Sequence, residues 1–167
     1  MNPKIRYAWG LSSLGDFIAA SSAHGLVAVE FAERGPVLPI ALHERFAQAD
    51  MVEDAAGMAA TVRALASLIE RPQTGSELAI DMHGTEFQRQ VWHALRGIPA
   101  GQTASYGMLA ASLGQPKAAR EVAQACAANT LAVLIPCHRI IKKDGSISGY
   151  RWGVRRKRAL LEREARA

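Results

Sequence analysis

The sequence Ile135-Pro136-Cys137-His138-Arg139-Ile140 decides how the rest of the chain is interpreted. The apolar run 131–135 is typical of a short buried strand, which a proline ends or confines to a sheet edge. Cys137 then stands where the chain leaves the core, and a neighbouring imidazole and cation can lower the pKa of a thiol enough to make it a nucleophile. Adjacent residues of an extended chain face opposite sides, so His138 reaches Cys137 only across a bend or through a water. A buried structural cysteine beside a surface histidine is the open alternative.

The composition is that of a globular protein. The chain has 167 residues, of which 49% are hydrophobic and 21% charged, enough for one large domain or two small ones. We find no apolar run of the roughly 18 residues that a membrane span needs and no signal peptide, so we expect a cytoplasmic protein without a membrane partner. The two cysteines, Cys126 and Cys137, lie 11 positions apart, and reduced thiols fit better than a disulfide. The histidines have no ligand-like spacing, so we predict no metal and no cofactor.

Positive charge is concentrated near the C-terminus. Residues 117–167 contain 12 Lys and Arg against 4 Asp and Glu, although the whole chain has a net charge of only +5. This asymmetry favours a polyanion-binding half on a mildly acidic support. An ordinary basic surface that keeps the protein in solution is the alternative.

The first 80 residues resemble a scaffold. Residues 7–32 alternate as two antiparallel strands joined by a turn at His24-Gly25. The spacing of apolar residues predicts helices over 40–49 and 51–70, and residues 78–82 resemble one more strand. None of these segments carries a recognisable catalytic motif.

The second half contains a helix-turn-helix pattern. Thr85 caps a helix with Gln88 three places later. A helix over 105–113 ends at Gly114, and a second helix is predicted from Pro116 to about residue 128. The second helix is rich in alanine, and Arg120 is its one long side chain, so we expect it to recognise DNA backbone and shape rather than sequence. A plain packing helix is the alternative.

Three features follow the hexapeptide. Asp144-Gly145 predicts a tight hairpin with two lysines at its tip. The aromatic loop 148–153 suits the wall of a flat pocket, or else anchors the loop to the core. A last helix is predicted over 154–165, and Glu164 near its end reads, from the residues alone, as a surface carboxylate.

The second half closely resembles the C-terminal domain of the O6-alkylguanine-DNA alkyltransferases. The resemblance rests on Gly84-Thr85-x-Phe87-Gln88, Ser105-Tyr106, Pro116-Lys117-Ala118-x-Arg120, Cys126-Ala127-Ala128-Asn129, Ile135-Pro136-Cys137-His138-Arg139 and Ser148-Gly149-Tyr150-Arg151-Trp152-Gly153. The last block is most similar to the alkyltransferase half of the bacterial adaptive-response protein. The resemblance implies an α/β, ribonuclease-H-like N-terminal domain over 1–80. It also implies a mostly α, winged helix-turn-helix-like domain over 81–167.

The resemblance also implies a catalytic apparatus. Cys137 would accept a methyl or alkyl group from O6 of guanine in DNA, and also from O4 of thymine, once per molecule. His138 would act as a base through a water, and Glu164 would orient it. Tyr106 would donate a proton to the leaving guanine, and Asn129 would shape the turn before the active-site segment.

The remaining site residues are assigned in the same way, with double-stranded DNA containing O6-alkylguanine as the partner of a monomeric protein. Substrate would contact Cys126, Ile140, Gly149, Tyr150, Arg151 and Trp152. DNA would contact Lys117, Ala118, Ala119, Arg120 and Arg139, with Arg120 filling the gap left by a flipped nucleotide. The zinc ligands of the animal proteins have no counterpart in residues 1–80, and Arg151 and Trp152 replace small residues, which bears on bulky alkyl groups.

Three other functional classes share part of this pattern. A winged helix-turn-helix regulator without alkyl-transfer chemistry would share the basic half but would not need Cys137. Lesion-binding relatives of the alkyltransferases lack that cysteine altogether. A cysteine peptidase is a weaker rival, because no oxyanion-hole glycines accompany the Cys-His pair.

Overall fold

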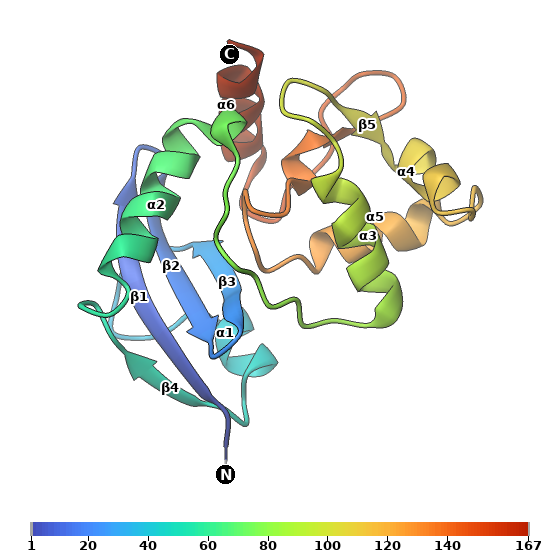
Figure 1. The fold of residues 1–167 in the computed structure, drawn as a ribbon. Helices are drawn as coiled ribbons and strands as arrows, with labels where there is room; N and C mark the ends of the chain where they lie inside the picture. The colour runs from blue at the N-terminus through green and yellow to red at the C-terminus, as the bar shows by residue number, and fades with distance from the viewer. Residues whose placement is uncertain (1, 167) are drawn as a thin grey trace.

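A four-stranded sheet forms the N-terminal half of the computed structural model, which describes residues 2–166 (Figure 1). The strands β1 (Lys4–Ser12), β2 (Gly15–Ser22) and β3 (Gly25–Phe31) pair antiparallel, and β4 (Asp50–Glu53) pairs parallel with β1. The strand order is therefore β3-β2-β1-β4. The sequence predicted β2 and β3 as an antiparallel pair but did not predict β1 as a separate strand.

Each face of the sheet is covered by different elements. Phe17 and Ala19 of β2 pack on one face, in a core shared with α2 (Ala59–Glu70). Ile18 and Ala20 pack on the other, against the short helix α1 (Ile40–Arg45). Because both faces are covered, residues 17–20 of β2 and 26–29 of β3 are apolar and buried without alternation.

The prediction of one helix over 51–70 is wrong. Asp50–Glu53 is extended and completes the free edge of β1, with Met51 opposite Ile5. The Asp54 carboxylate then accepts from the backbone N–H of Gly57 at 2.9 Å, which turns the chain before α2 begins. Edge pairing thus outweighed the helical spacing of the apolar residues. A short 3₁₀ turn, η1 (Pro72–Thr74), comes after α2. Residues 78–82 then form an isolated bridge at Ile80 rather than the predicted regular strand.

Helices dominate the C-terminal half, which lies beside the sheet in Figure 1. It contains α3 (Glu86–Arg96), α4 (Tyr106–Ser112), α5 (Ala119–Ala127) and α6 (Val154–Ala165), with a two-stranded ladder of β5 (Ala104–Ser105) and β6 (Ile140–Ile141). The predicted capping box is confirmed, since Thr85 accepts from the N–H of Gln88 at 3.1 Å and the Gln88 side chain accepts from the N–H of Thr85 at 2.9 Å. The last helix has the predicted bounds.

Two local predictions in this half are corrected. Gly114 has the predicted left-handed conformation (φ +75°), but Pro116 does not start a helix. The N–H of Ala118 donates to the Gln115 carbonyl in an intervening turn, and α5 begins at Ala119. Residues 142–146 form a turn closed by a Lys142–Ser146 backbone hydrogen bond, but β6 pairs with β5 in parallel and not with a following strand, so the predicted hairpin is absent from the described residues.

One hydrophobic core joins the two halves. It contains Phe17 and Val29 of the sheet together with Trp92 of α3, Val122 of α5 and Leu160 of α6. The Trp92 indole N–H donates to the Ala125 carbonyl at 2.9 Å, which holds α3 against α5. Within residues 2–166, no helix is both long and apolar enough to cross a membrane.

Candidate active site

Cys137 lies at the end of a buried turn and not at the end of a strand as predicted. Residues 131–135 are all buried, but Val133 has φ 69°, which no extended strand tolerates. Leu131 forms one bridge to Val29 of β3, and the chain then turns into a 3₁₀ segment, η2 (Cys137–Arg139). The prediction that residues 131–135 are buried is confirmed, but the prediction that they form a strand is wrong.

The side chain of Asn129 holds this turn together. Its Oδ1 accepts from the N–H of Leu131 at 2.9 Å, and its Nδ2 donates to the Ile135 carbonyl at 3.1 Å. The same Nδ2 also lies 3.3 Å from the Cys137 Sγ, as a donor to sulfur. Asn129 is fully buried, so its amide fixes both the turn and the position of the thiol.

The Cys137 thiol faces a cavity of about 340 Å³. The lining residues come from α4, α5, η2 and the aromatic loop: Tyr106, Ala123, Cys126, Ala127, Cys137, Gly149, Tyr150 and Arg151. Burial raises the pKa of Cys137, opposed by the Asn129 hydrogen bond and the positive charge of Lys157. The expectation that neighbouring groups lower the pKa of this thiol is therefore not met in the protein alone, because burial dominates.

His138 of η2 and Glu164 of α6 form a buried pair. The His138 Nε2 lies 2.9 Å from the Glu164 Oε1, and both side chains are at most 1% exposed. Burial lowers the pKa of His138, although the Glu164 carboxylate acts in the opposite direction. A neutral imidazole beside a carboxylate carries its proton on Nε2, which leaves the lone pair on Nδ1. The Nδ1 atom is buried without a hydrogen-bond partner among residues 2–166.

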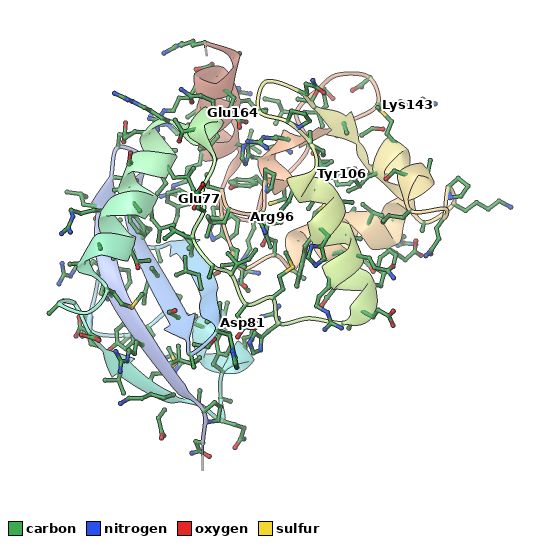
Figure 2. All side chains as sticks on the ribbon, viewed as in Figure 1. Glu77, Asp81, Arg96, Tyr106, Lys143 and Glu164 are labelled. Carbon is green, nitrogen blue, oxygen red and sulfur yellow. The ribbon has the colours of Figure 1, made fainter. Side chains whose placement is uncertain are left out.

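Arg139 completes this network. Its Nε donates to the Glu164 Oε2 at 2.9 Å, its Nη2 donates to the same oxygen, and its Nη1 donates to the Ile98 carbonyl at 2.6 Å. The Arg139 side chain is 10% exposed and committed to these partners, which leaves little of it for DNA, and its predicted DNA contact stays a prediction. The structure contradicts the interpretation of Glu164 as a surface carboxylate, because Glu164 is buried. Figure 2 labels Glu164 on α6 and Tyr106 at the start of α4.

Sequence reasoning missed Lys157, which it counted among the basic residues of α6. The Lys157 ammonium is fully buried and donates to the Ser148 hydroxyl at 2.9 Å and to the Gly149 carbonyl at 3.2 Å. The Ser148 hydroxyl lies 3.1 Å from that of Tyr106. Burial lowers the pKa of Lys157. The one sequence signal was its helical spacing from Leu160 and Glu164, which places all three on the inward face of α6.

Comparison with known proteins gives matches over half or more of the chain. Residues 86–166 match the family model described as "6-O-methylguanine DNA methyltransferase, DNA binding domain". A methylated-DNA–protein-cysteine methyltransferase of Mycolicibacterium paratuberculosis is 41% identical over 114 residues, covering 68% of this chain and 69% of that protein. The crystal structure of Mycobacterium tuberculosis OGT in complex with DNA superposes with a TM-score of 0.79 at 33% identity, covering 98% of this chain and 93% of the other. The chain belongs to the methylated-DNA–protein-cysteine methyltransferase family.

The methyltransferase resemblance extends to a larger relative. The bifunctional transcriptional activator/DNA repair enzyme Ada of Escherichia coli is 44% identical over 164 residues, which cover 98% of this chain. The chain spans 46% of the length of that relative and of the Salmonella typhimurium regulatory protein ada. The structural neighbours have mixed α/β and helical content, in agreement with the expected combination of an α/β half and a mostly helical half. The ribonuclease-H-like and winged helix-turn-helix-like descriptions stay predictions.

The candidate site brings together most, but not all, of the predicted substrate residues. Cys126, Gly149, Tyr150 and Arg151 line the cavity. Ile140 and Trp152 are buried and absent from its lining: the Ile140 carbonyl accepts from Ser148, and the Trp152 ring packs edge-on against Tyr150 and Phe31. Ile140 and Trp152 therefore pack behind the residues that form the cavity wall.

The predicted DNA-binding residues other than Arg139 lie near the start of α5. Lys117 and Arg120 are exposed, while Ala118 and Ala119 are half-buried. Across the part of the chain that the structure describes, no three His, Cys, Asp or Glu side chains are grouped to hold a metal ion. The predicted absence of a metal and of a cofactor stays a prediction.

Proposed function

We propose that the protein repairs DNA by direct reversal of alkylation. The Cys137 sulfur attacks the methyl or alkyl carbon on O6 of guanine, the sulfur–carbon bond forms as the carbon–oxygen bond breaks, and guanine leaves. O4 of thymine presents the same chemistry and is a second substrate. A thioether is not cleaved by any group in the site, so transfer is irreversible and each molecule reacts once. The observation that carries the proposal is a thiol facing a cavity of about 340 Å³ beside a buried His–Glu pair.

Proton transfer is the task of the groups around the sulfur. His138, whose Nδ1 has no other partner among the described residues, takes the thiol proton through a water, and Glu164 fixes the imidazole. Displacement leaves electrons on the guanine ring, and Tyr106 lies at the cavity to protonate N3. The Lys157–Ser148–Tyr106 chain of hydrogen bonds can then return a proton to the phenol.

DNA binding is assigned to α4 and α5, acting as the helix-turn-helix of a winged helix-turn-helix-like domain over 81–167. The alanine-rich surface of α5 allows close approach to the sugar-phosphate backbone, and the target nucleotide is flipped into the cavity. The sheet over 1–80 acts as a ribonuclease-H-like support. The partner is double-stranded DNA that contains O6-alkylguanine, bound by a monomer in the cytoplasm.

Intact-protein mass spectrometry tests the proposed reaction. After incubation with a duplex that carries O6-methylguanine, one methyl group should be found on the peptide that contains Cys137. Transfer to another residue, or no transfer from a lesion-bearing duplex, contradicts the proposal. An undamaged duplex of the same sequence is the control.

Replacing Arg120 by alanine should slow repair in duplex DNA far more than reaction with free O6-benzylguanine. Unstacking a base costs a few kcal/mol, and a side chain that fills the gap offsets that cost only when the base comes from a duplex. We expect a loss of about 10- to 100-fold on duplex and less than about twofold on the free base. Single-turnover kinetics on both substrates measures the difference. Arg63→Ala, an exposed arginine on α2, is the matched control, and equal losses on both substrates would contradict the role.

DNA affinity should fall steeply as salt rises. The C-terminal 51 residues carry 12 Lys and Arg, and each phosphate contact releases a counterion. With about four to six contacts, the slope of log affinity against log salt would be about −4 to −5. Fluorescence anisotropy with an undamaged duplex between low and physiological salt measures this slope. The rate with free O6-benzylguanine should hardly respond to salt, and a flat binding curve would argue against phosphate contacts.

A further inference from the structure

A buried carboxylate of the sheet contacts the wall of the cavity. Glu30 lies near the end of β3 and is 4% exposed. Its Oε1 accepts from the Nη2 of Arg151 at 2.8 Å, across 121 residues of sequence. Glu30 itself does not line the cavity, whereas Arg151 does. This ion pair therefore connects the N-terminal sheet directly to the aromatic loop.

Arg151 also connects the two walls of the cavity to each other. Its Nη1 donates to the Ala127 carbonyl at 3.3 Å, at the end of α5. Its guanidinium lies 5.6 Å from the centre of the Trp152 ring, which supports Tyr150. Ala127 of α5 and Tyr150 of the aromatic loop both line this cavity. The distance between α5 and the aromatic loop thus depends on where the Arg151 guanidinium is held.

A second cation lies close to the pair. Arg45 of α1 donates to the Ala128 carbonyl at 3.1 Å and to the His83 carbonyl at 2.6 Å. Burial and the charge of Arg151 lower the pKa of Arg45, and the charge of Glu30 opposes this. The Glu30 Oε2 is buried and has no hydrogen-bond partner in residues 2–166. Glu30 therefore forms an ion pair with one cation and acts by charge on a second, and both cations contact the C-terminal end of α5.

We infer that Glu30 is a positioning residue that, through Arg151, sets the width of the base pocket between α5 and the aromatic loop. The inference rests on the proposed function and adds a determinant of substrate size to it. Two contacts hold the guanidinium in place, the Glu30 carboxylate on one side and the Ala127 carbonyl on the other. Without the carboxylate charge, Arg151 is free to turn toward solvent or toward a DNA phosphate, and the pocket loses its defined width.

Glu30→Gln tests this inference because it keeps the size of the side chain and removes its charge. We expect the maximal single-turnover rate on O6-methylguanine duplex to fall about tenfold, less than the roughly hundredfold loss that a 1 Å misplacement can cause. The half-saturating DNA concentration should stay within about twofold, since Glu30 is not on the α5 surface proposed to bind DNA. The rate on O6-benzylguanine duplex should fall less, so that the benzyl-to-methyl ratio rises. Glu30→Asp, which keeps the charge, should recover most of the wild-type ratio.

Glu70→Gln is the matched control. Glu70 of α2 approaches Arg163 of α6 at 3.9 Å, so the same substitution removes another ion pair between the sheet half and a C-terminal helix. Neither residue lines the cavity, and both rates should stay at the wild-type level.

Two outcomes would overturn the inference. One is a benzyl-to-methyl ratio in Glu30→Gln equal to that of Glu70→Gln. The other is an equal loss of rate on both substrates that parallels a fall in the melting temperature, which would show that Glu30 is a purely structural residue. If Glu30→Gln does not fold, Glu30→Met, which also removes the charge and keeps the length of the side chain, takes its place, and the same two outcomes overturn the inference. A wild-type protein that transfers no alkyl group would instead contradict the proposed function.

Discussion

Replacing Cys137 by alanine should abolish alkyl transfer, with a loss of at least about 10³-fold in single-turnover rate, because the nucleophile itself is removed. No other thiol in the cavity can substitute. Cys126 lines the same space, but burial, together with the nearby Cys137, raises its pKa to about 12. It therefore stays protonated at neutral pH, and unlike Cys137 it has no histidine next to it in the sequence to accept its proton. Intact-protein mass spectrometry with a methylated duplex measures the transferred group.

The second cysteine provides the comparison for this experiment. Cys126→Ala should still acquire the methyl group on the peptide that contains Cys137. Circular dichroism should show that both variants still melt cooperatively, since each substitution removes only one sulfur atom from the core. Methylation of the Cys137→Ala variant at the wild-type rate would show that the acceptor is elsewhere and that the site has been misread.

Replacing Glu164 by glutamine should destabilise the protein by about 3–5 kcal/mol, the typical cost of removing one partner from a buried ion pair. The change leaves the Arg139 guanidinium buried without its carboxylate and deprives the His138 Nε2 of an ionised acceptor. Chemical denaturation at pH 7 measures the free energy of unfolding. Alkyl transfer should slow as well, because the imidazole loses the group that fixes its tautomer. A loss under about 1 kcal/mol would show that the network contributes little.

The same network predicts how stability depends on pH. Burial acts to raise the pKa of Glu164, but the hydrogen bonds from His138 and Arg139 outweigh it and hold the pKa below the ordinary value. Folding therefore favours the ionised form. Its contribution is complete above the pKa of the unfolded chain and is lost as pH falls through the lower folded value. Wild type should lose stability more steeply than Glu164→Gln on acidification below about pH 4, and parallel curves would contradict this assignment.

Local signals in the sequence were reliable where one residue determines the backbone. Thr85 and Gln88 form the predicted cap, and Gly114 ends α4 in a left-handed conformation. Predictions failed where distant segments decide. Asp50–Glu53 is a strand because β1 has a free edge beside it. The run 131–135 is a turn because the Asn129 side chain supplies its hydrogen bonds.

The site shows the same division between motif and environment. The adjacent residues Cys137 and His138, and the aromatic loop, could be located from the motif alone. The burial of Arg139 could not be predicted, because its partner Glu164 is 25 residues away. For Lys157 and Glu164 the only signal was their helical spacing from Leu160, which is weak in a helix with many other charged residues. Glu30 was missed for a related reason, since its partner Arg151 is 121 residues away.

The hydrophobic core that contains Phe17 of β2 also contains Cys137. The apolar contacts that exclude water from around the sulfur are therefore the same ones that bind the sheet to the helices. Heat, denaturant or a core mutation in the sheet also disturbs the surroundings of the nucleophile. Loss of folding stability and loss of alkyl transfer are thus expected to occur together.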